Sequence, residues 1–223
     1  MGRSTKRREL QKYFWINATS KNYPANQPRA AEILPRSWWA LAFIEEEHRH
    51  ARWLGRFLQQ EGLPLLYKQW TDSIFRRLRR LAGLRTSIAV LISAEIMAQV
   101  YYRALKLATD SETLNELCQQ ILREEAQHVR FQVQQLARMD RRRSPLLRRC
   151  LRWADRLLFG IASWVVYHDH RTVFAKAGVS KAEFKKWCER RWYGTEILYA
   201  KKSSGLVTLP SLSPGGSSEA RGG

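Results

Sequence analysis

The chain has 223 residues, 44% of them hydrophobic, and carries 39 basic against 20 acidic side chains, a formal net charge of +19. This length suits one globular domain with a sizeable core, so a second domain is not required. The longest apolar run, Leu157 to Tyr167, spans 11 residues and includes Gly160 and Ser163. A helix needs ~20 apolar residues to cross a bilayer, so no transmembrane segment is expected. The basic start, MGRSTKRREL, has no apolar stretch behind it, so a secretory signal is not expected, and an organelle transit peptide stays open.

Three regions are expected along the chain. Residues 1–30 form a basic N-terminal segment that can hold a short first helix, and residues 31–198 form a helical bundle. The Ser-, Gly- and Pro-rich residues 199–223 have the composition of a disordered tail. No run of alternating apolar and polar residues bounded by hairpin turns occurs, so the fold class predicted is all-α with antiparallel helices and short loops.

The first two long helices are marked by proline and glycine. Pro35 opens the first, because proline fits the first helical turn, and Gly62 supplies the stop. Asp72 can cap a following segment, which Gly83 interrupts. The apolar stretch from Ile88 to Leu107 then continues as the second long helix.

Polar caps mark the remaining helices. We expect Asp110 to cap the third helix, SETLNELCQQILREEAQHVRFQVQQLARM, which ends in a run of three arginines. Ser144 followed by Pro145 is a cap with proline at the first helical position, and it begins a fourth helix. Ser180 and Glu183 have the spacing of a capping box at the start of a last helix.

The three cysteines, Cys118, Cys150 and Cys188, are far apart in the sequence and form no Cys-x-x-Cys pair. Their odd number and wide spacing argue against a zinc knuckle and against a disulfide framework. A reducing, cytoplasmic environment is therefore expected.

The segment EEEHRH in the first long helix contains two overlapping Glu-x-x-His pairs, Glu45 with His48 and Glu47 with His50. Residues at i, i+3, i+4 and i+7 share a helix face, so the neighbours of each pair indicate which pair is buried. The neighbours of Glu45 include three arginines, whereas those of Glu47 are apolar. Glu47 and His50 are therefore predicted to face the core, and Glu45 and His48 to face solvent. The apolar neighbours of Glu47 are Ala40, Phe43, Ile44, Ala51, Leu54 and Leu58.

The third helix repeats the pattern as Glu125-Ala-Gln-His128, again on an apolar stripe. Glu95, on the second helix, is the only charged residue between Thr86 and Tyr102. Burying three unpaired carboxylates would cost several kcal/mol each or force them to take up protons. Two divalent metal ions would supply the compensating charge, and helical bundles bind such pairs through Glu and Glu-x-x-His ligands.

The stretches FIEEEHRHARWLGRFL, AEIMAQVYYRALKLAT and ILREEAQHVRFQVQQLA resemble the ferritin-like superfamily of di-iron carboxylate proteins, most closely a bacterial branch of that superfamily. The resemblance covers residues 38–190. It implies an antiparallel four-helix bundle, here with one or two extra C-terminal helices.

The resemblance also implies a ligand set. Glu47 and Glu125 would bridge two metal ions, His50 and His128 would each bind one ion, and Glu95 would be a terminal ligand. Iron is the metal expected, with manganese as a second choice. The activity implied is an oxygen-dependent oxidoreductase that acts on a small molecule the sequence does not identify.

One ligand departs from the family pattern. A glutamate is expected as far before Glu47 as Glu95 lies before Glu125, which points to position 17, where Asn17 stands. Glu9 is the nearest acidic residue before that position. Either Glu9 completes the site through a longer connection, or the site has only three carboxylates.

A non-catalytic function is the alternative. Arginine clusters lie in RRLRRLAGLR, residues 76–85, and in RRRSPLLRRCLR, residues 141–152. Such clusters suit nucleic acid or an anionic lipid surface, although no sequence-reading motif accompanies them. The sequence also leaves a homodimer open.

Overall fold

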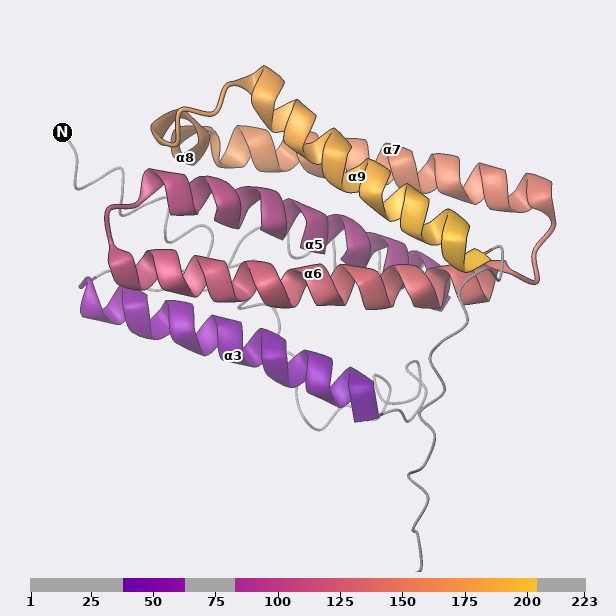
Figure 1. Ribbon diagram of the computed structural model, residues 1–223, viewed down its shortest axis with the longest axis horizontal. Helices are drawn as coiled ribbons and strands as arrows, with labels where there is room; N and C mark the ends of the chain where they lie inside the picture. Colours follow the sequence, from indigo (N-terminus) through magenta and orange to yellow (C-terminus); the bar gives the residue numbers. More distant parts are fainter. Residues whose placement is uncertain (1–37, 63–82, 204–223) are drawn as a thin grey trace, which may run out of the picture.

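The computed structural model describes residues 38–62 and 83–203, and every regular element in these two ranges is an α-helix. The all-α class predicted from the sequence is confirmed for this part of the chain. Figure 1 shows the helices as an elongated bundle. In chain order they are α3 (Trp38–Gln60), α5 (Gly83–Ala108), α6 (Glu112–Asp140), α7 (Pro145–Asp169), α8 (Arg171–Lys176) and α9 (Lys181–Ser203).

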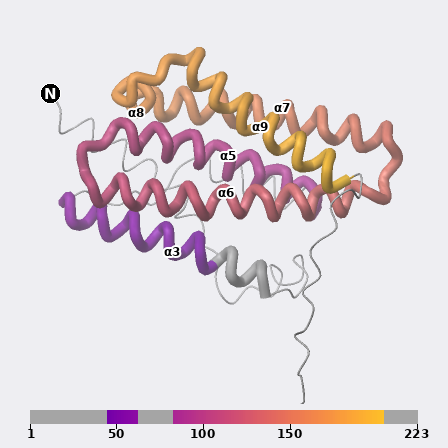
Figure 2. The backbone as a smooth tube through the Cα atoms, in the orientation of Figure 1, coloured from indigo at the N-terminus to yellow at the C-terminus, as the bar shows by residue number. Residues whose placement is uncertain are grey.

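Helices α5 and α6 form the central pair of the bundle. A short connection joins them, and they pack against each other along their length. Helix α3 packs on α6 at one side of the pair, while α7, α8 and α9 cover the other side (Figures 1 and 2). The central pair therefore separates α3 from α7.

Helix α5 is the core helix. By length and composition alone, this helix could cross a membrane. The sequence expectation considered only continuous apolar runs and so did not include it. Most of its apolar stretch is buried inside the bundle. A helix at the centre of a soluble bundle is apolar on most sides because most sides pack against other helices. The largest buried side chains of α5, Tyr101 and Tyr102, are fully inaccessible.

The predicted helix ends agree with the structure in most places. Gly62 follows α3 with φ of 64° and donates its amide to Gln59, so it is the glycine that closes the helix. Gly83 also has a positive φ, 71°, where α5 begins. Ser144 accepts a hydrogen bond from the Leu147 amide, as an N-cap does.

The capping box at the start of α9 is formed as predicted. The Ser180 hydroxyl accepts from the Glu183 amide at 3.2 Å, and the Glu183 carboxylate accepts from the Ser180 amide at 2.9 Å. These two bonds satisfy donors that the first helical turn would otherwise leave unpaired.

Two boundaries differ from the predictions. The N-cap of α6 is Ser111, whose hydroxyl accepts from the Leu114 amide, and the side chain of Asp110 is 90% exposed. Helix α9 continues to Ser203, past the boundary at residue 198 that composition suggested. Four predictions lie outside the described residues: the helix start at Pro35, the segment from Asp72 to residue 82, the basic residues 1–30 with Glu9 and Asn17, and the tail from residue 204.

A buried ionic cluster, which we call the Arg85 cluster, joins four helices at one end of the bundle. The Arg85 guanidinium, at the start of α5, donates to Asp155 of α7 at 2.6 and 2.7 Å. It also donates to Asp140, the last residue of α6, at 3.1 and 3.2 Å. Tyr199 of α9 donates its hydroxyl to Asp140 at 3.0 Å. The cluster fixes the register of α5, α6, α7 and α9 relative to one another.

Candidate metal centre

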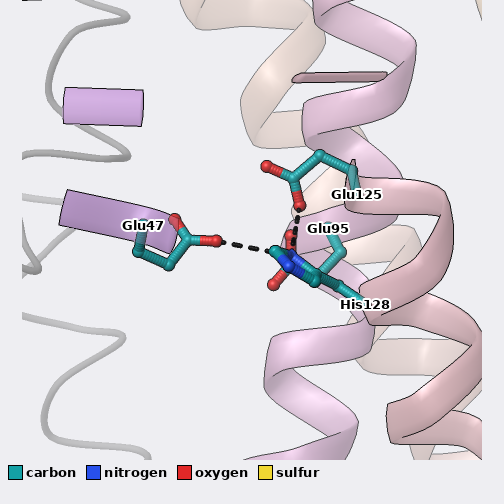
Figure 3. Close-up of side chains that lie close together, drawn as sticks. All are labelled: Glu47, Glu95, Glu125 and His128. Carbon is teal, nitrogen blue, oxygen red and sulfur yellow. Dashed lines mark hydrogen bonds and ion pairs between the residues drawn. The ribbon is translucent and has the colours of Figure 1, made fainter. Parts of the chain in front are cut away.

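Four of the five residues predicted as ligands converge at the interface of α3, α5 and α6. Each of Glu47, Glu95, Glu125 and His128 offers one ligand atom, and these atoms all lie within 4.8 Å of one another. Figure 3 shows their side chains pointing toward one another, Glu47 from α3, Glu95 from α5, and the other two from α6. Helical spacing places these residues on the inner faces of their helices, and the packing of the three helices brings them together.

His50, the fifth predicted residue, lies at the edge of this group. Its side chain is fully buried, and its Nδ1 is 3.5 Å from Oε1 of Glu125. The other oxygen of Glu125, Oε2, is 3.3 Å from Nδ1 of His128. The rings of His50 and His128 have centroids 6.3 Å apart. Glu125 therefore lies between two histidines and presents one carboxylate oxygen to each.

Of the other Glu-x-x-His pair on α3, Glu45 faces solvent as predicted, whereas His48 does so only in part. The side chain of Glu45 is 63% exposed and makes an ion pair with Arg52 at 2.6 Å. His50 is fully buried, whereas His48 is only half-buried. The flanking arginines thus indicate the outer face of α3 correctly, because guanidinium groups keep to water.

Two glutamates that the sequence reading did not select hold the outer nitrogens of the histidines. Nε2 of His128 donates to Glu46 of α3 at 2.6 Å. In the opposite direction, Nε2 of His50 makes a hydrogen bond to Glu124 of α6. Each helix therefore orients the histidine of the other.

The repeated motif could have revealed these partners. Both helices carry Glu-Glu-x-x-His, as Glu46-Glu47-x-x-His50 and Glu124-Glu125-x-x-His128. Glu46 of α3 meets His128 of α6, and His50 of α3 meets Glu124 of α6. Residue numbers therefore rise along α3 as they fall along α6, so the two helices are antiparallel. A carboxylate that accepts from the outer nitrogen fixes the imidazole tautomer, so that Nδ1 is the nitrogen able to accept a metal.

The amide side chains of two glutamines, Gln99 and Gln132, surround the candidate metal centre. Gln132 donates through Nε2 to Oε1 of Glu95 at 3.2 Å, and Gln99 donates to the main-chain carbonyl of Glu125 at 3.2 Å. Both glutamines are buried. They hold α5 against α6 at the level of the site, and periodicity alone gave no reason to select them.

The electrostatics of the centre are those of carboxylates crowded in a buried space. Burial, with the nearby charge of Glu125, raises the pKa of Glu47 to about 8. Burial and the same charge raise the pKa of Glu95 well above its ordinary value. Glu47 is therefore mostly protonated at neutral pH when no metal is bound, and the same causes favour the protonated form of Glu95.

Glu125 carries the negative charge of the metal-free centre. Burial of Glu125 opposes its charge, but hydrogen bonds from Glu95 and His128, with the adjacent imidazole of His50, outweigh burial and lower the pKa of Glu125 to about 2. Burial likewise opposes the charging of His128, yet its contacts with Glu125 and Glu46 raise its pKa to about 9. Protons thus supply the positive charge that a metal could supply instead.

The donors present are of the kinds that hold a metal ion. Three carboxylates and two imidazole Nδ1 atoms form the oxygen-rich, nitrogen-containing set that suits iron or manganese. Two of these atoms, Oε1 of Glu47 and Nδ1 of His50, are buried and make no hydrogen bond. A buried polar atom without a hydrogen-bond partner is costly, and a metal ion would satisfy both atoms.

Compared with protein-family models, with curated proteins and with solved structures, the chain matches none of them. The function proposed next therefore rests on the residues of the centre and on the motif resemblance.

Proposed function

We propose that this chain is a ferritin-like di-metal carboxylate protein, with iron as its metal and manganese as the second choice. The observation that carries the proposal is the position of Glu125. Its two oxygens lie 3.5 Å and 3.3 Å from the Nδ1 atoms of two different histidines. One carboxylate between two separate imidazoles is the arrangement that a shared ligand of two ions requires.

The roles of the remaining residues follow from their positions. Glu47 would share the second bridge, because its Oε1 lies 3.6 Å from Nδ1 of His128 and has no hydrogen bond. His50 and His128 would each hold one ion, and Glu95 would bind from α5 on the opposite side. Glu46 and Glu124 would keep both imidazoles in the tautomer that ligation needs.

The reaction class proposed is an oxygen-dependent oxidation of a small molecule. When bound, two iron ions of this ligation supply redox chemistry with dioxygen. The residues of the chain orient the ligands and limit access of water, since Glu95, Glu125 and His128 are all buried. Protons held by Glu47 and Glu95 would leave when the metal enters.

Metal stoichiometry tests the proposal. The protein is treated with a chelator, reloaded with ferrous iron or manganese under anaerobic conditions, and its metal content is measured. Two ions per chain are expected for the wild type. A matched variant, Glu45→Ala, changes the outward-facing glutamate of the same segment and should also hold two ions. Failure of the wild type to bind either metal would overturn the proposal.

A further inference from the structure

Helix α7 presents large apolar side chains to solvent. Leu146, Trp153, Leu157, Ile161 and Trp164 are each between 53% and 73% exposed. They recur at intervals of three, four and seven residues, so they lie on one side of the helix. We call these five residues the α7 face. Most of the large exposed hydrophobic side chains of the described residues are on this one helix, and a contiguous set of this kind marks an interaction surface.

The α7 face is also hollowed. A groove of about 440 Å³ runs over Gly160 between Trp153 and Trp164, lined almost entirely by apolar atoms. Helix α7 packs against α5 and α9 with its other side, so the groove is the outer surface of the bundle. It lies across the central helix pair from α3, which carries half of the candidate metal centre (Figure 1).

Positive charge borders the α7 face. Lys181 and Lys185 of α9 line a second groove that also contains Gly160 and Trp164, so these lysines adjoin the face. Both lysines are exposed, as is Arg149 on α7 itself.

The carboxylates nearby offset this charge only in part. Asp155 is buried in the Arg85 cluster. Glu189, on α9, pairs with Arg156. Glu183 is exposed between Lys181 and Lys185 on α9 and offsets one of these charges. The border of the α7 face is therefore basic, as the net charge of +19 for the whole chain suggests.

We propose that the α7 face rests on the surface of a membrane that contains anionic lipid. A helix with tryptophan and aliphatic side chains on one side and basic side chains beside them has the composition of an interfacial helix. Indole rings favour the level of the lipid headgroups, and the lysines and arginine meet the negative surface potential. The helix would lie in the plane of the interface, because its inner side packs on α5 and α9.

A second copy of the chain or a nucleic acid would account for either the apolar side chains or the basic border of the α7 face, but not for both. A second copy of the chain would cover the apolar side chains but would bring two basic borders together. A nucleic acid would neutralise Arg149, Lys181 and Lys185 but offers no partner to Leu146, Leu157 and Ile161. An anionic bilayer accommodates both the apolar and the charged groups.

Vesicle binding tests the inference on the full chain. Co-sedimentation is measured with vesicles of phosphatidylcholine alone and with an equimolar mixture of phosphatidylcholine and phosphatidylglycerol. Binding to the anionic vesicles is expected, at least tenfold stronger than to the neutral ones, and it should weaken as salt rises. Equal binding to both, or binding to neither, would overturn the proposal.

Variants locate the surface. Trp153→Ser combined with Leu157→Ser should lower binding at least tenfold. The matched control is Leu107→Ser combined with Tyr193→Ser, since both of these side chains are large, apolar and exposed outside α7. If the two double variants bind anionic vesicles equally, the α7 face is not the contact. All four positions are exposed, and circular dichroism would verify that helix content is kept.

Cys150 provides a direct reporter. It is exposed and lies four residues after Leu146, whereas Cys118 and Cys188 are buried. Burial raises the pKa of both buried thiols to about 12, so a thiol-reactive fluorophore should label Cys150 alone. The label should become shielded from iodide when anionic vesicles are added. If an oligonucleotide shields the label, the partner is a nucleic acid and not a membrane. If higher protein concentration shields it without lipid, the partner is a second copy of the chain.

This inference is independent of the proposed metal function. Metal content would not change in the α7 variants, and vesicle binding would not change in Glu125→Ala.

Discussion

His128 on α6 donates through Nε2 to Glu46 on α3, 2.6 Å away, although the two residues are 82 positions apart in the chain. The matching contact joins His50 of α3 to Glu124 of α6. A histidine that binds a metal commonly donates its other nitrogen to a carboxylate, which sets the tautomer and the ring orientation. Both imidazoles of this centre have that support from the neighbouring helix.

Replacing Glu124 with Gln should weaken metal binding without removing a ligand. The amide keeps the size of the side chain but loses the charge that holds Nε2 of His50. Loss of such a carboxylate costs about 10- to 100-fold in metal affinity. Competition with a fluorescent chelator measures the affinity, and Glu116→Gln, at an exposed position of the same helix, is the control. Unchanged affinity in Glu124→Gln would remove Glu124 from the centre.

Glu125→Ala should remove both metal ions, whereas His50→Ala should remove only one. The reason is that each oxygen of Glu125 faces a different histidine, at 3.5 Å and 3.3 Å. Metal analysis after reloading gives the ratio of ions to chains for each variant. Equal losses in the two variants would show that Glu125 serves one ion and not two.

The metal-free protein should lose stability as pH rises from about 6 to 9. Glu47, with its pKa raised from 4.5 to about 8, and His128, raised from 6.5 to about 9, both keep protons in the folded state that the unfolded chain releases. Because the folded state binds more protons over this range, the free energy of unfolding falls with pH, by a few kcal/mol. Urea denaturation at the two pH values measures the change.

Two comparisons with the metal-free wild type identify the groups that cause this pH dependence: the Glu47→Gln variant and the metal-bound protein. Glu47→Gln, whose amide resembles the protonated acid, should flatten the decline, while Glu45→Gln should not. With metal bound the decline should disappear, since metal replaces the protons and its affinity increases with pH. An equally steep decline in Glu47→Gln would place the titrating groups elsewhere.

Arg85→Met should destabilise the fold by about 3 kcal/mol, because it removes the buried cation that two carboxylates share and leaves each of them with one arginine. Asp140 keeps Arg143 at 3.2 Å, and Asp155 keeps Arg152 at 3.1 Å. Asp140 and Asp155 both accept from the Arg85 guanidinium. Urea denaturation measures the loss, and Arg138→Met, at an exposed position of α6, is the control. Adding Asp140→Asn and Asp155→Asn should recover part of the loss, since the residues act as one unit. A single-variant cost near that of Arg138→Met would contradict this role.

The sequence by itself determined the local features of this protein. The caps at Ser144 and Ser180 and the glycine at the end of α3 are read from neighbouring residues, because each acts within one helical turn. The inward face of α3 followed from the side chains three and four positions from Glu47. The same reasoning selected Glu95, Glu125 and His128, which the fold brings together.

Tertiary structure alone decided the contacts between helices. Glu46 and Glu124 meet histidines 82 and 74 residues away, and Arg85 meets Asp140 and Asp155 across 55 and 70 residues. Such pairs depend on the register in which the helices pack, and helical periodicity gives the face of each residue but not its partner on the next helix. The packing of the helices also leaves the apolar stripe of α7 exposed. The sequence does not indicate this, because the same stripe would be equally suited to the core.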